Sequence, residues 1–195
     1  MGRGRKRILF CGGTEKGKST RVEEMILHRN KKTGEPVIIL DPNRQQKWFP
    51  YPAINFDLLK GMKKGIYRIN TEDYETFFSI VFKYFQHGVV VAEDASNFLT
   101  AQKNEKIYPN LIALRHPDHD VDIVFITHSL SETPKYIFRQ LNEVILFKTG
   151  DTWDDAEVRI PDDKKEIFKK KFISVNQDKD QYACRRIIIQ KTGTK

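Results

Sequence analysis

Short apolar runs alternate along this chain with longer stretches that carry apolar residues at helical spacing. Runs 8–11 and 37–40 are apolar at every position, and run 88–92 differs only by its leading glycine. Such unalternated runs are typical of strands buried on both faces of a parallel sheet. Stretches 18–30 and 72–86 instead place apolar residues three and four positions apart, as amphipathic helices do. The alternation predicts βαβ units around a central, mostly parallel sheet.

The same reasoning extends to the rest of the chain. Further strands are expected over 66–69, 122–126, 144–147 and 186–190, and further helices over 104–115, 134–140 and 164–171. Residues 42–65 contain three prolines and are expected to be irregular, and Thr71 is the predicted N-cap of the helix over 72–86. We divide the chain into a basic N-terminal arm over 1–7, a core domain over 8–150 and a charged C-terminal extension over 151–195 that packs on the core.

Composition narrows the class of protein. The 195 residues are 39% hydrophobic, which suits one folded α/β domain. Cys11 and Cys184 are the only cysteines, which excludes a disulfide framework or a zinc pattern, and Cys11 is expected to be a buried, reduced thiol. The charged residues 1–7 precede an apolar run too short for a signal peptide or a transmembrane segment, so we expect a cytoplasmic protein.

The chain is basic. Its 34 lysines and arginines outnumber 26 acidic residues, for a net charge of +8. This balance favours polyanionic partners such as nucleic acid, although a basic surface that only keeps the protein soluble has the same charge. Three clusters are candidate contacts to a phosphate backbone: Arg3, Arg5, Lys6 and Arg7; Lys60, Lys63 and Lys64; and Lys164, Lys165, Lys169, Lys170 and Lys171. Any one of them can instead be a solvated charged face.

One motif carries specific chemistry. Residues 12–19 fit the Walker A pattern G-x-x-x-x-G-K-[ST] in full and lie between an apolar strand and an amphipathic helix, as a P-loop requires. The predicted nucleotide-binding residues are Gly12, Gly13, Thr14, Glu15, Lys16, Gly17, Lys18, Ser19 and Thr20. Backbone N–H groups would cradle the phosphates, Lys18 would reach the β- and γ-phosphates and Ser19 would ligate Mg²⁺. The motif predicts a P-loop nucleoside triphosphatase that hydrolyses ATP with Mg²⁺.

An acidic pair follows a later strand. Glu93 and Asp94 come directly after the run 88–92, at the carboxyl end of a strand, where α/β sheets bind ligands. We assign Glu93 to Mg²⁺ and Asp94 to the attacking water, although the Glu-Asp order leaves open that the two roles are exchanged. Asp41 also ends an apolar strand. It is either a competing ligand or, as we favour, a structural turn residue.

Another strand end and several arginines complete the candidate site. Thr127 and His128 follow the run 122–126, and if that strand adjoins the P-loop strand, either side chain can reach the γ-phosphate or the attacking water. An arginine supplied by a neighbouring subunit would stabilise charge in the transition state, and the candidates in order are Arg115, Arg139 and Arg44.

These elements together resemble the FtsK–HerA superfamily of DNA-pumping ATPases. More narrowly, they resemble small viral genome-packaging ATPases and zonula-occludens-toxin-like phage assembly proteins. The matching segments are 8–20, the strand ending at Asp41-Pro42, 89–94, 111–116, and 122–129 with Pro134, Arg139, Asn142 and 145–148. Two departures are the Glu93-Asp94 order and the Thr127-His128 pair, where the family often has Thr-Gln. The resemblance implies a three-layer RecA-like fold, ATP with Mg²⁺, a homo-oligomeric ring of five or six subunits, and double-stranded DNA threaded through it.

We therefore expect an ATP-driven DNA translocase that packages a viral genome, located in the host cytoplasm or in the virion and recruited by capsid or membrane vertex proteins. Three alternatives stay open. One is a phage assembly or extrusion ATPase, which usually carries a transmembrane segment. Another is a small-molecule P-loop kinase, which would be a monomer with an arginine-rich lid. A third is a non-catalytic nucleotide switch or scaffold.

Overall fold

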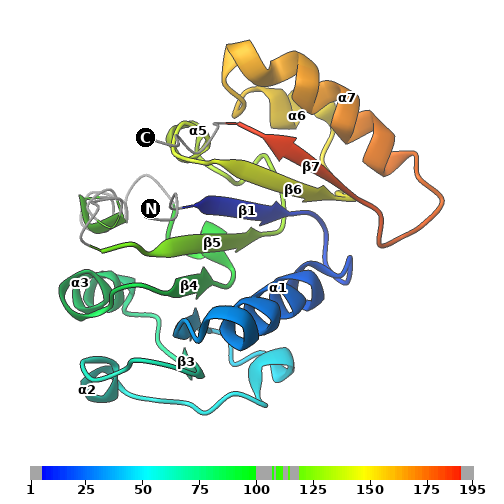
Figure 1. The fold of residues 1–195 in the computed structure, drawn as a ribbon. Helices are drawn as coiled ribbons and strands as arrows, with labels where there is room; N and C mark the ends of the chain where they lie inside the picture. Colours follow the sequence, from blue (N-terminus) through cyan, green and yellow to red (C-terminus); the bar gives the residue numbers. More distant parts are fainter. Residues whose placement is uncertain (1–5, 100–106, 108, 112–113, 115–118, 190–195) are drawn as a thin grey trace.

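The computed structural model describes residues 6–99, 107, 109–111, 114 and 119–189. Within these residues a single sheet has seven strands in the order β3-β2-β4-β5-β1-β6-β7 (Figure 1). The strands are β1 (Arg7–Cys11), β2 (Val37–Leu40), β3 (Ile66–Ile69), β4 (Val89–Ala92), β5 (Asp122–Thr127), β6 (Glu143–Phe147) and β7 (Cys184–Ile188). Every neighbouring pair is parallel except β6 and β7. The predicted α/β fold with a central, mostly parallel sheet is confirmed.

Helices cover both faces of this sheet. They are α1 (Lys18–Thr33), α2 (Phe56–Leu59), α3 (Tyr74–Tyr84), α5 (Lys135–Phe138), α6 (Trp153–Glu157) and α7 (Lys165–Asn176), with 3-10 turns η1 (Gln46–Trp48), η2 (Ala95–Asn97) and η3 (Asp162–Lys164). Helix α1 and turn η1 pack on one face, and α3 and α7 pack on the other. No helix in the described part of the chain has the length and apolarity needed to cross a membrane.

Strand β1 shows why the apolar runs do not alternate with polar residues. Ile8 and Phe10 pack against the α1 layer, whereas Leu9 and Cys11 pack into the layer that contains α3 and α7. Because both faces of the strand are covered, its four positions after Arg7 are all apolar. The result is a three-layer arrangement, with the sheet between two apolar cores.

Local details differ from the sequence-based expectations at the start of α3 and at two short helices. The N-cap of α3 is Asp73, whose carboxylate accepts from the N–H of Thr76; Thr71, the predicted cap, instead accepts from the N–H of Asp73 at 3.0 Å. Helix α2, which lies in the stretch 42–65 that was expected to be irregular, and helix α6 were not predicted, because their four and five residues are too few to show a period. The helix expected over 104–115 lies largely outside the described residues.

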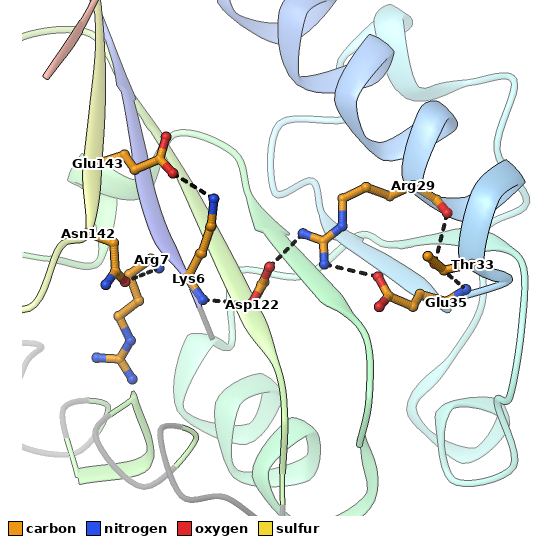
Figure 2. Close-up of polar contacts among 8 residues, drawn as sticks. All are labelled: Lys6, Arg7, Arg29, Thr33, Glu35, Asp122, Asn142 and Glu143. Carbon is orange, nitrogen blue, oxygen red and sulfur yellow. Dashed lines mark hydrogen bonds and ion pairs between the residues drawn. The ribbon is translucent and has the colours of Figure 1, made fainter. Parts of the chain in front are cut away.

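An ion-pair network holds the amino ends of the strands, at the edge of the sheet opposite the P-loop (Figure 2). Asp122, which is 1% exposed, accepts from the backbone N–H of Lys6 at 2.7 Å and from Arg29 at 2.6 Å. Glu143 accepts from Lys6 at 2.9 Å and from Arg186 at 2.8 Å. The network therefore joins β1, β5, β6 and β7 to helix α1.

Replacing Asp122 by alanine should lower the free energy of unfolding by about 2 kcal/mol, because the half-buried Arg29 then keeps only Glu35 as a partner and the backbone N–H of Lys6 loses its acceptor. Urea unfolding measures the change. Asp57→Ala is the matched control, since Asp57 forms an exposed ion pair with Lys60, and such pairs contribute little to stability. Equal losses in the two variants would show that the buried network contributes nothing particular.

Candidate active site

The loop between β1 and α1 has the backbone of an anion cradle. Gly17 has φ 84° and is the N-cap of α1, and Glu15 has φ 59°. At Gly12, which has φ 153°, a Cβ atom would lie 2.6 Å from Cβ of Phe147 and 2.9 Å from the carbonyl oxygen of Lys148. The close approach of β6 therefore requires glycine at position 12. The sixteen-residue helix α1 directs its N-terminal N–H groups and positive dipole end into the loop.

The Lys18 side chain lies inside this cradle. Its Nζ donates to the carbonyl oxygen of Gly13 at 2.7 Å, and the residue is 6% exposed. Burial lowers the pKa of Lys18, while the nearby Cys11, Glu93 and Asp94 favour its charged form. The loop thus places one ammonium group beside a set of backbone N–H donors, which is the arrangement that binds phosphates.

Glu93 lies across from the loop. Its carboxylate accepts from the Ser19 hydroxyl at 3.3 Å and from the indole Nε1 of Trp48 at 2.9 Å. The residue is 2% exposed, and burial, with the charge of Asp94 second, raises the pKa of Glu93 to about 7. Of the two acidic residues, Glu93 is therefore the one whose carboxylate reaches the P-loop serine.

Asp94 is held differently. It adopts φ 48°, a left-handed conformation that non-glycine residues rarely take, and it is 5% exposed. Oδ1 lies 2.8 Å from Nε2 of His128, and Oδ2 accepts from Asn43 and, at 3.1 Å, from Gln45. Strained backbone of this kind persists only where neighbouring groups hold it, and it gathers at functional sites.

The order of the strands explains why these groups meet. Strand β5 lies between the P-loop strand β1 and the acidic strand β4, and all three are parallel. Ala92 pairs with Phe125, so the acidic pair and the Thr127-His128 pair leave the sheet at the same level of the same edge. The condition set for Thr127 and His128, that their strand adjoins the P-loop strand, is met.

Only one of those two side chains turns toward the acidic pair. His128 contacts Asp94, whereas Thr127 is fully buried, with its hydroxyl 3.4 Å from that of Thr133. Thr127 also shares a hydrogen bond with Cys11, whose pKa is raised by burial to about 12, so that this thiol is neutral and inert. Cys11 is thus a core residue, as predicted.

The remaining candidates are distributed as follows. Arg115 lies outside the described residues. Arg139 is the C-cap of α5, and Arg44 lies in the loop after β2; both are exposed. Asp41 is fully buried, accepts from the N–H of Gln45 at 2.9 Å and faces Arg68 at 3.6 Å. These contacts favour the structural role for Asp41.

The basic clusters are partly neutralised within the chain. Lys6 pairs with Glu143, Arg7 is buried in β1, and Arg3 and Arg5 lie outside the described residues. Lys60 pairs with Asp57, while Lys63 and Lys64 are exposed. On η3 and α7, three lysines pair with acids one to four residues away: Lys164 with Asp163, Lys165 with Asp162 and Lys170 with Glu166. Exposed pairs of this kind are weak and can exchange for phosphate contacts.

Sequence reasoning missed three residues that hold the acidic pair. Trp48 is fully buried and packs its loop onto the core, and its indole also donates to Glu93. No role was predicted for Asn43 or Gln45, whose side chains donate hydrogen bonds to Asp94. Their position in the sequence is the feature that could have identified them. Residues just after β2 must lie beside the end of β4, because the two parallel strands pair.

The groups around Ser19 fit a magnesium ion. Mg²⁺ prefers hard oxygen ligands, keeps several waters and takes one or two ligands from the protein near substrate phosphates. The Ser19 hydroxyl and the Glu93 carboxylate are two such oxygen groups, 3.3 Å apart. The site is therefore chemically suited to Mg²⁺ beside a bound triphosphate.

Comparison with known proteins gives structural matches alone: no family model and no curated protein sequence matches the chain. The genome packaging NTPase B204 of Sulfolobus turreted icosahedral virus 2, solved with ATP-gammaS, has a TM-score of 0.70 at 16% identity, covering 98% of this chain and 95% of that one. B204 has also been solved with AMPPCP, at a TM-score of 0.67.

Two longer proteins match in part. The pCW3 conjugation coupling protein TcpA has a TM-score of 0.51 at 13% identity, with 83% of this chain and 53% of that one covered. EccC of Thermomonospora curvata has a TM-score of 0.53 at 11% identity, with 77% and 31% covered. The chain therefore has a P-loop NTPase fold, and it matches the fold of a viral genome packaging NTPase over nearly its whole length.

Proposed function

We propose that this chain is an ATPase that drives double-stranded DNA into a viral capsid. The observation that carries the proposal is the near-complete overlap with B204, a protein described as a DNA-packaging ATPase, in a chain that keeps a full Walker A loop. TcpA and EccC align over part of their lengths, whereas B204 and this chain align almost end to end. The shared fold thus extends to the C-terminal extension and not only to the nucleotide site.

The geometry supports a division of roles at the site. Lys18 and the loop N–H groups would hold the triphosphate, and Ser19 with Glu93 would hold Mg²⁺, which neutralises charge on the phosphates when bound. Asp94 would orient or accept a proton from the attacking water, because it lies beside Glu93 and is fixed by His128. Because His128 contacts Asp94, its surroundings would change when the γ-phosphate leaves, and His128 would then report hydrolysis.

The ring and its DNA contacts belong to the same proposal. An arginine of the adjacent subunit would complete the site, with Arg115 first in order and then Arg139 and Arg44. Lys63 and Lys64, which are exposed, and the lysines of α7 would contact the DNA backbone without regard to sequence. We place the protein in the host cytoplasm or at a vertex of the virion.

The proposal is tested by measuring ATP turnover with and without double-stranded DNA, together with the mass of the assembly by light scattering. A translocase should assemble into a ring of five or six subunits and turn over ATP several-fold faster with DNA, and the stimulation should fall steeply with salt. A monomer whose turnover ignores DNA and requires a small phosphate acceptor would instead be a kinase.

A further inference from the structure

A cavity of about 450 Å³ opens beside the P-loop. Its wall includes Gly17 and Thr20 from the loop and the first turn of α1, Phe147 at the end of β6, and Tyr182 and Cys184 from the C-terminal extension. Its volume lies within the range of small-molecule sites, roughly 300–1,000 Å³, and its wall is mainly apolar, as in such sites. No role has been assigned above to Tyr182 or Cys184.

Tyr182 has an unusual position for a tyrosine. It is 56% exposed, and a Cβ added to Gly17 would lie 3.5 Å from its Cδ1 atom, so the ring lies against the P-loop glycine. An exposed aromatic ring at the wall of an apolar cavity has a free face on which a planar ligand can stack. Every nucleobase has such a π-face, and stacking on an aromatic side chain stabilises it whatever the base.

The Tyr182 loop is fixed relative to the P-loop. The Asp180 carboxylate accepts from the N–H of Tyr182 at 2.9 Å, and Asp178 accepts from the N–H of Asp180 at 3.0 Å. Lys148 then joins the two loops: its ammonium donates to the carbonyl oxygen of Asp178, and its own carbonyl oxygen accepts from the N–H of Gly13 at 2.7 Å. One residue thus anchors both the phosphate cradle and the turn that carries the tyrosine.

We propose that this cavity binds the base of the nucleotide, with Tyr182 stacked on its face. The inference rests on the proposed phosphate site. A nucleotide held by the loop leaves it past Thr20, which lines the cavity. The rim of the cavity also carries the charged side chains of Lys16, Arg21 and Glu24, of which the last two pair with each other at 2.8 Å, so charged groups border the apolar wall on which the base would stack. The C-terminal extension is then part of the nucleotide site.

The test compares two ligands that share a triphosphate. ATPγS carries a nucleoside and inorganic tripolyphosphate does not, so calorimetric titration of both, with Mg²⁺, isolates the contribution of the nucleoside, which includes the base. Tyr182→Ala should weaken ATPγS binding about tenfold, which is 1.4 kcal/mol, and leave tripolyphosphate binding unchanged. Tyr182→Phe keeps the ring and should bind ATPγS as the unaltered protein does. Tyr84→Ala removes a partly exposed tyrosine on α3, in the other helical layer, and should change neither affinity.

The possible results separate this inference from the proposed function. If ATPγS binds the Tyr182→Ala and unaltered proteins equally, while Lys18→Ala loses both ligands, the phosphate site stands and the base site is overturned. If Tyr182→Ala weakens both ligands alike, the ring supports the loop and does not bind the base, which also overturns the inference. If the unaltered protein binds neither ligand, the proposed function fails and this inference fails with it.

Discussion

Replacing Lys18 by alanine should reduce kcat/KM for ATP by a factor of about 10³, because the ammonium is the charged side chain inside the cradle and acts on charge that grows in the transition state. Its Nζ already lies within the loop, 2.7 Å from the Gly13 carbonyl oxygen. Steady-state release of phosphate measures the loss.

The controls for this variant must show whether the effect comes from losing a positive charge anywhere on helix α1 or from losing the ammonium group at position 18. Lys31→Ala removes an exposed lysine from the last turn of the same helix and should leave turnover unchanged. Lys18→Arg keeps the charge, but the guanidinium is larger than the space that a buried ammonium fills, so it should also lose most activity. Turnover retained in Lys18→Ala would remove the P-loop from the chemistry altogether.

The fold could largely be predicted from the sequence, because the patterns that indicate its strands and the P-loop lie within short segments. Strands β1, β2, β4, β5 and β6 each contain an unbroken run of four apolar residues. In the loop over 12–19, the glycines themselves mark the positions that need unusual backbone torsions. What local pattern could not supply was strand order. Thr127 and His128 looked equivalent in the sequence, and only the packing of β5 between β1 and β4 buries the threonine and turns the histidine to Asp94.

The same limit explains the missed residues. Trp48 meets Glu93 across 45 positions of sequence, and Tyr182 meets the P-loop only because β7 folds back beside β6. A tyrosine in a charged extension has no periodic or motif context that marks it. Residues of this kind become visible only after the long-range pairing of strands is known.

Replacing Glu93 by glutamine should abolish turnover and, at the same time, stabilise the folded protein at alkaline pH. The pKa of this carboxyl is raised from 4.5 to about 7, chiefly by burial and then by Asp94. The folded state therefore holds a proton that the unfolded state releases, so the unaltered protein loses stability as the pH rises from about 4.5 through 7. Glutamine carries no charge at any pH, yet its carbonyl oxygen can still accept from Trp48 and its amide can donate to Ser19.

The measurement is urea unfolding of both proteins at pH 5 and pH 8, with EDTA present so that no Mg²⁺ offsets the buried charge. The stability difference should be small at pH 5 and grow to about 2–3 kcal/mol at pH 8, since one pKa unit corresponds to about 1.4 kcal/mol. Glu166→Gln, at an exposed position on α7, should show no such growth. A stability difference that stays constant with pH would mean that the charged carboxylate of Glu93 does not destabilise the folded protein. A growing difference would identify Glu93 as a residue whose buried carboxylate destabilises the fold at alkaline pH.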